Sequence, residues 1–159
     1  KENNIFRVVH KVYQGEPLQT RSGDWIKKGD KILKLHLYNY RLAKLIQNKQ
    51  SEVHLAILLR NLIKQSLYGL CAYIQSLPKE YEVKGIIGTT MLNRGAERLG
   101  FTIHDVNPSF YNSWKGLQNL WMYMLVHPEG LQYIKKHGKR LQAKHLVMST
   151  EELLQRYSR

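Results

Sequence analysis

The sequence predicts an α+β domain in which a small mixed β-sheet packs with about five helices. Three observations lead to this fold class: strand-like runs near both ends of the chain, a long helix-like run in the middle, and a return to strand between shorter helical segments. The 159 residues fit one domain, and 43% of them are hydrophobic, which is enough for a packed core. We therefore expect residues 1–159 to form a single domain.

The first forty residues predict an antiparallel β meander. Residues 5–13 carry β-branched and aromatic side chains, as strands do. Glycine turns at residues 22–24 and 28–30 then bracket Trp25 and Ile26. Residues 31–37 alternate apolar and polar side chains, so this strand should have one apolar face.

The middle of the chain predicts helices. Asn39 is placed to cap the first of them, and residues 53–77 predict the core helix, because leucine and isoleucine recur there every three or four residues. Arg60 and Lys64 interrupt this apolar run. A charged side chain at a bilayer centre costs at least about 2.5 kcal/mol, so we expect no transmembrane span.

Strand and helix alternate in the second half. Residues 83–90 predict a strand that runs into a glycine turn at residues 88–90, and residues 91–99 predict a helix that ends at Gly100. Residues 101–103 predict a further short strand, and this order favours a parallel or mixed sheet.

The C-terminal third predicts two helices, a strand and a last helix. The helices are expected over residues 107–124 and 131–137, and the strand over residues 143–148. The last helix is expected over residues 149–157, with Ser149 as its N-cap.

The chain is strongly basic. It carries 25 Lys and Arg against 12 Asp and Glu, a net charge of +13. Such a charge favours an anionic polymer or an anionic membrane surface as partner, and nucleic acid is a further possibility, although the charge also serves solubility. A glycan is the other expected partner. No acidic residue occurs between Gly130 and Thr150, and this stretch holds the predicted basic patch of Lys135, Lys136, Lys139, Arg140 and Lys144.

The most pointed polar pattern lies where the strand over residues 31–37 meets the next helix. His36 is on the polar side of that strand, and Asn39 stands at the helix start. An imidazole and an amide at a helix N-terminus can bind an anion or a sugar hydroxyl. The alternative is that Asn39 only caps the helix and His36 only satisfies a backbone group.

A second candidate is the Gly88-Thr89-Thr90 run. A strand, a turn and a helix in this order can form a cradle of backbone N–H groups for a phosphate or carboxylate, with Arg98 adding charge. The alternative is that Arg98 is a solvated side chain. The known nucleotide-binding glycine patterns are absent from the sequence.

Several chemistries lack their motif. Cys71 is the single cysteine, so neither an intramolecular disulfide nor a cysteine zinc site can form. The seven histidines include no His-x-x-x-His or His-x-His pair, and no Gly-x-Ser-x-Gly elbow occurs. We therefore expect neither a metal site nor a cofactor.

Together, the run from Gly29 to Asn39, the Gly88-Thr89-Thr90 run, residues 98–101 and the ending from Met148 to Tyr157 resemble the YkoP-like domain. This family occurs alone in Firmicutes and also fused behind polysaccharide deacetylase catalytic domains. The catalytic motifs of the deacetylase are absent here, so deacetylation does not carry over. The resemblance implies an accessory role beside envelope polysaccharide chemistry.

The leading hypothesis from the sequence is therefore a non-catalytic accessory domain that binds an anionic or glycan ligand at the cell envelope. We expect it in the cytoplasm or peripheral to the bacterial membrane. One alternative is a small enzyme for an envelope or phosphate-containing substrate, with His36 as general base and Arg98 as anion stabiliser. The other is a nucleic-acid-binding protein.

Overall fold

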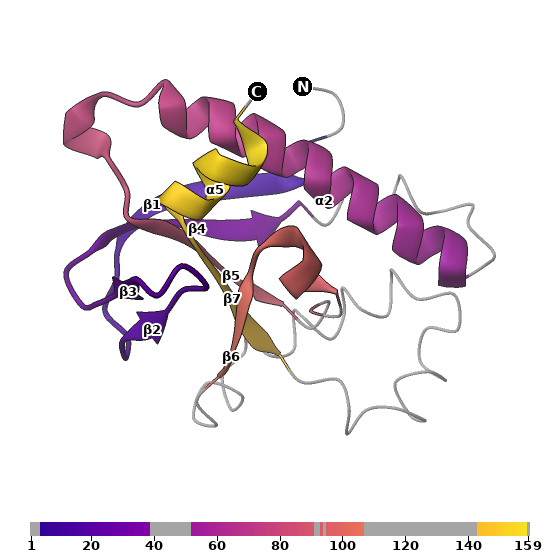
Figure 1. Cartoon of the computed structure of the whole chain (residues 1–159), viewed down its shortest axis with the longest axis horizontal. Coiled ribbons are helices and arrows are strands. Elements are labelled where there is room, and N and C mark those ends of the chain that lie inside the picture. The colour runs from indigo at the N-terminus through magenta and orange to yellow at the C-terminus, as the bar shows by residue number, and fades with distance from the viewer. Residues whose placement is uncertain (1–3, 39–51, 91–92, 94, 107–142, 159) are drawn as a thin grey trace.

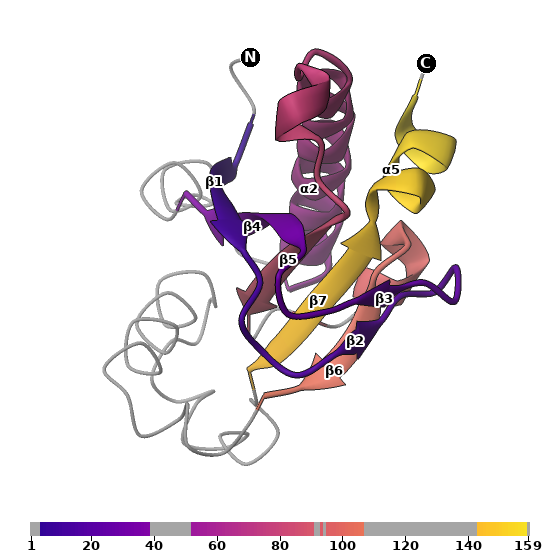
Figure 2. The ribbon, with the colours of Figure 1, turned by 90° about the vertical axis from the view of Figure 1, so that its left-hand side faces the viewer.

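The computed structural model describes residues 4–38, 52–90, 93, 95–106 and 143–158. In this part of the chain, two α-helices lie on one face of a five-stranded mixed sheet, and a two-stranded hairpin lies on the other face (Figures 1 and 2). The predicted α+β class with a mixed sheet is confirmed. The expected number of about five helices is not supported, because the described residues form only α2 and α5.

The large sheet has its strands in the order β1-β4-β5-β7-β6. Strands β4 and β5 are parallel, and every other neighbouring pair is antiparallel. The strand predicted near residues 143–148 is therefore an inner strand of the sheet. The bounds in spatial order are Phe6–Val12 for β1, Lys31–Leu37 for β4, Gly85–Thr90 for β5, Lys144–Ser149 for β7 and Thr102–Asp105 for β6.

The expected N-terminal meander is wrong in its pairing. Strand β1 pairs directly with β4, whereas β2 (Leu18–Gln19) and β3 (Trp25–Ile26) pair with each other as a separate hairpin. The hairpin folds across the sheet because Ile26 is an apolar anchor and Gly85 makes room for it: a Cβ atom at Gly85 would lie 2.7 Å from Cδ1 of Ile26. The buried residues of this contact are Leu18, Ile26, Ile32, Ile87 and Val147.

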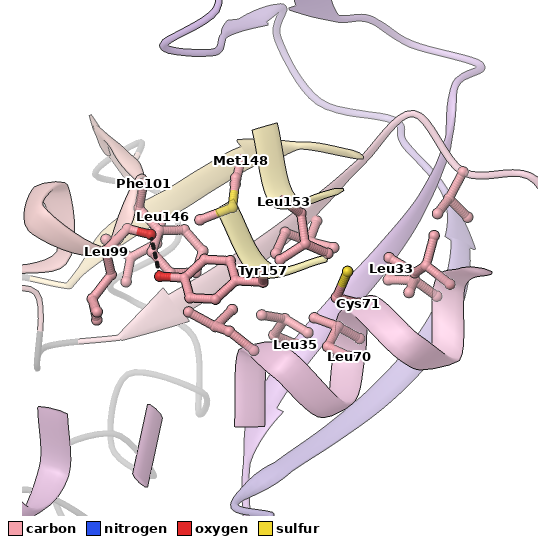
Figure 3. Packing of buried hydrophobic residues seen from close by; sticks show 14 of the residues in the cluster. Leu33, Leu35, Leu70, Cys71, Leu99, Phe101, Leu146, Met148, Leu153 and Tyr157 are labelled. Atoms are coloured by element: carbon pink, nitrogen blue, oxygen red, sulfur yellow. Dashed lines mark hydrogen bonds between the residues drawn. The ribbon is translucent and has the colours of Figure 1, made fainter. Parts of the chain in front are cut away.

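The predicted core helix is confirmed as α2, Glu52–Gln75. Neither α2 nor any other helix of the described residues is long and apolar enough to cross a bilayer. Helices α2 and α5 (Thr150–Tyr157) pack onto the strands and enclose the main core, seen close up in Figure 3. The predicted N-cap of α5 is also confirmed, since Oγ of Ser149 accepts a hydrogen bond of 3.1 Å from the N–H of Glu152.

The turn predicted at residues 88–90 does not form, because β5 continues to Thr90 while its backbone pairs with β7. In place of the helix expected over residues 91–99, the described residues show the short 3-10 helix η2, Ala96–Leu99. Gly100 ends it with a positive φ of 99°, as predicted. A second 3-10 helix, η1, spans Lys79–Tyr81.

The helices predicted after Asn39 and over residues 107–124 and 131–137 lie outside the described residues.

A candidate binding site on the hairpin face of the sheet

Successive side chains of a strand point to opposite faces, so each strand of the sheet contributes to two surfaces. The helix face is the side covered by α2 and α5, where Leu33, Leu35, Ile86 and Met148 are buried. The hairpin face is the opposite side. The β2–β3 hairpin covers one part of it over the apolar cluster around Ile26, and polar side chains occupy the strands beyond.

On the hairpin face, one polar residue from each strand lies at the same level of the sheet. Arg7 pairs with His36, Thr89 pairs with His145, and His145 pairs with His104. The β4–β5 pairing extends to Leu35 and Gly88, and the next residues along these two parallel strands are His36 and Thr89. We call this set the polar row; in spatial order it is Arg7, His36, Thr89, His145 and His104.

The centre of the polar row is the contact between Thr89 and His145. Oγ1 of Thr89 and Nδ1 of His145 are 2.8 Å apart, so the hydroxyl fixes the orientation of the imidazole. His145 is half-buried, and burial lowers its pKa below 6.5, with smaller contributions in the same direction from the charges of Lys34 and His104. The ring of His145 is therefore neutral at neutral pH.

His104 forms the end of the polar row on β6. Its Nε2 lies 2.7 Å from the backbone oxygen of Gln19 in β2. Because a carbonyl oxygen only accepts hydrogen bonds, Nε2 of His104 carries the proton and donates it. This bond ties the row to the β2–β3 hairpin, so the hairpin helps to position the site.

The electrostatic character of the row is positive or neutral, since none of its five positions is acidic. Lys34 lies two residues before His36 on the same face of β4, and it acts on His145 electrostatically. Within the described ranges, no three His, Cys, Asp or Glu side chains are arranged to hold a metal ion. Arginine, lysine, hydroxyl and imidazole groups together suit an anion.

The structure brings some of the site residues predicted from the sequence together and places others elsewhere. It brings His36 and Thr89 to the same face at the carboxyl ends of two parallel strands, a common position for ligand sites. Thr90 points to the helix face instead, and a Cβ atom at Gly88 would lie there too, against Leu35, because both residues flank Thr89 in a strand. Arg98 is exposed on η2, whose buried residues belong to the main core, and is not part of the row.

The predicted basic patch is only partly described. Asn39 and the patch residues Lys135, Lys136, Lys139 and Arg140 lie outside the described residues. Lys144 is described, and its Nζ forms an ion pair with Oδ1 of Asp105 across β7 and β6. That contact holds the pKa of Asp105 below its usual range. The patch therefore stays a prediction.

Sequence reasoning missed Lys34, His104 and His145. Lys34 stood on the polar side of a correctly predicted strand, so strand alternation alone could have added it to His36. The two histidines become neighbours only through the pairing of β7 with β6, between residues far apart in the chain. Their spacing along the sequence carried no signal for that pairing.

Comparisons with known proteins agree with the family resemblance found in the sequence. The family model described as YkoP domain matches residues 1–157. The chain is 33% identical to the "Uncharacterized protein YkoP" of Bacillus subtilis (strain 168), over 99% of this chain and 84% of that protein. No solved structure is significantly similar to the present chain.

Proposed function

We propose that this chain, which belongs to the YkoP domain family, is an accessory domain that binds an anionic group of a cell-envelope polymer through the polar row. The observation that carries this proposal is the alignment of cationic and neutral hydrogen-bonding side chains on one face, with Thr89 and His145 2.8 Å apart at its centre. The envelope is proposed because related domains also occur behind polysaccharide deacetylase catalytic domains.

Each group has a role that follows from its chemistry. Lys34 and Arg7 supply fixed positive charge, which raises the local concentration of an anion. His36 and Thr89 supply an imidazole and a hydroxyl near the carboxyl ends of β4 and β5. His145, neutral and held in place by Thr89, can donate a hydrogen bond to an oxyanion without the cost of burying a second charge.

A charge-matched pair of variants tests this proposal. Lys34→Gln and Lys64→Gln remove the same charge, one beside the polar row and one from the exposed surface of α2 on the other side of the sheet. With poly(glycerol phosphate) as the probe, we expect Lys34→Gln to weaken binding about five-fold, equivalent to about 1 kcal/mol for a lysine near an anionic surface. Lys64→Gln should stay within about two-fold.

Titration calorimetry at two salt concentrations measures both variants. If the two variants lose affinity equally, the net charge of the chain and not the polar row binds the polymer. Duplex DNA serves as the comparison polyanion. If DNA binds more tightly than poly(glycerol phosphate) and stays micromolar near physiological salt, nucleic-acid binding replaces the envelope proposal.

One observation favours a second candidate function, hydrolysis of an anionic substrate. A half-buried imidazole with a lowered pKa and a hydroxyl at Nδ1 is arranged as a general base would be. In this candidate enzyme the general base is His145. It takes the place of His36, the base expected from the sequence, and Arg98 has no role because it lies outside the polar row. Turnover of phosphodiester or acyl ester substrates that disappears in His145→Gln, with binding retained, would support the enzyme.

A further inference from the structure

Three rings meet at the outer edge of the helix face, away from the polar row. His10 lies on β1 and points to the helix face, Tyr73 lies near the end of α2, and Tyr81 ends η1. The His10 ring is edge-on to both tyrosines, with ring centroids 6.1 Å from Tyr73 and 6.3 Å from Tyr81. Nε2 of His10 is 2.9 Å from the hydroxyl of Tyr73. We call these three residues the aromatic cluster.

The aromatic cluster is exposed although its rings are large. Tyr73 keeps 38% of its surface accessible and Tyr81 keeps 54%. His10 is exposed as well. Aromatic rings normally gain stability by burial, so three neighbouring rings left in water are not explained by the packing of the core. The His10 ring is inclined by 65° to Tyr73 and by 72° to Tyr81, so the three rings form a partly apolar surface of inclined rings and not one flat platform.

The position of Tyr81 does not depend on burial of its own ring. Nζ of Lys31 donates a 2.8 Å hydrogen bond to the backbone oxygen of Glu80, and the N–H of Lys84 donates one of 2.8 Å to the oxygen of Lys31. These bonds fix the backbone before and after Tyr81 to Lys31 at the start of β4. The ring is therefore presented by a fixed backbone, and little conformational freedom is lost when a ligand stacks on it.

We propose that the aromatic cluster binds a neutral pyranose ring of a carbohydrate. A pyranose with equatorial hydroxyls exposes axial C–H groups on its faces, and these weakly positive hydrogens suit the negative face of a tyrosine ring. The hydroxyls at the rim of the sugar find hydrogen-bonding partners in the Tyr73 hydroxyl and the His10 imidazole. A cationic ligand also suits aromatic rings, but the net charge of +13 opposes its approach.

This proposal is independent of the polar row, which lies on the other face of the sheet. It predicts saturable binding of cellotetraose and of the β-1,4-linked N-acetylglucosamine tetramer, with a Kd on the order of 1 mM. The measurement is two-dimensional NMR of the histidine ring signals of the whole chain. The signal of His10, assigned by its loss in His10→Gln, should move as either sugar is added.

Matched variants make the test specific. Tyr81→Ala should weaken sugar binding at least ten-fold. Tyr38→Ala removes a tyrosine that is 49% exposed and directly follows β4, and it should stay within two-fold. Tyr73→Phe keeps the ring and should cause a smaller loss than Tyr81→Ala. Because Tyr81 is exposed, its replacement should leave the thermal unfolding midpoint nearly unchanged, which separates lost binding from lost folding.

Three results would overturn the inference. The first is no movement of the His10 signal up to about 20 mM of either sugar, since a useful stacking site binds more tightly than that. The second is equal loss in Tyr81→Ala and Tyr38→Ala. The third is binding of choline with none of the sugars, which would identify the cluster as a site for quaternary ammonium groups. His145→Gln should not alter sugar binding, so the polar row and the cluster can fail separately.

Discussion

The two faces of the large sheet are built from the same strands and have opposite characters. On the helix face, β4, β5 and β7 present Leu33, Ile86 and Met148 to the helices, and all three are almost fully buried. On the hairpin face, the residues in between include Lys34, Thr89 and His145, which are only half-buried. The difference arises within single strands, because neighbouring residues point in opposite directions.

This contrast predicts which substitutions change the stability of the fold and which change only the proposed binding surface. Where α2 and α5 cover it, the helix face is filled with apolar contacts, so a change at those positions acts on stability. The hairpin face needs apolar residues only beneath β2–β3, and beyond the hairpin it carries polar groups that the core does not require. Two adjacent residues of β4 can therefore differ completely in what their replacement does.

The largest expected effect is on the helix face. Leu33→Ala removes a side chain with no exposed surface and should lower the free energy of unfolding by about 2–5 kcal/mol. His36→Ala, on the same strand but exposed on the hairpin face, should change it by no more than about 0.5 kcal/mol. Urea unfolding of both variants measures the difference, and similar losses would contradict the contrast between the faces.

A smaller effect is expected where the two faces are joined. Oγ of Ser149 caps α5 on the helix face and lies 3.2 Å from Oγ of Ser22 in the loop of the hairpin. Ser149→Ala should cost about 1 kcal/mol, the usual cost of losing an N-cap. Ser22→Ala leaves the cap intact and serves as the control. If Ser22→Ala lowers the free energy of unfolding as much as Ser149→Ala does, the contact between the two serines contributes more than the N-cap.

The smallest effect at neutral pH is expected for His145→Gln, and it grows on acidification. Because the pKa of His145 is lowered, the unfolded chain binds a proton there more readily than the folded chain. The folded state should therefore lose stability as the pH falls below 6.5, and Gln should remove that part of the loss. Unfolding curves between pH 8 and about pH 5 measure it. Identical pH profiles of the two proteins would show that His145 is not the sensitive group.

Much of the helix face could be predicted from local patterns. The leucines of α2, the alternation in β4 and the Ser149 cap are all set by residues close in sequence, and the structure confirms each of them. These elements follow from helical and strand periodicity, which short windows of sequence contain.

The hairpin face could not be predicted in the same way, since it depends on contacts between distant residues. The β2–β3 hairpin does not pair into a meander, because Ile26 packs against Gly85, a residue far away in the sequence. The turn expected at Gly88 is replaced by strand because β4 and β7 pair with β5 on both sides. The polar row likewise exists only once this order of strands is known.

The place of β7 between β5 and β6 also affects how the protein can be made. During synthesis β5 and β6 leave the ribosome first, and each must wait for β7 before its shared edge is paired. Unpaired edges are the sites at which nascent chains adhere to one another. A chain stalled before Lys144 should therefore aggregate or engage chaperones and not settle into a smaller stable domain.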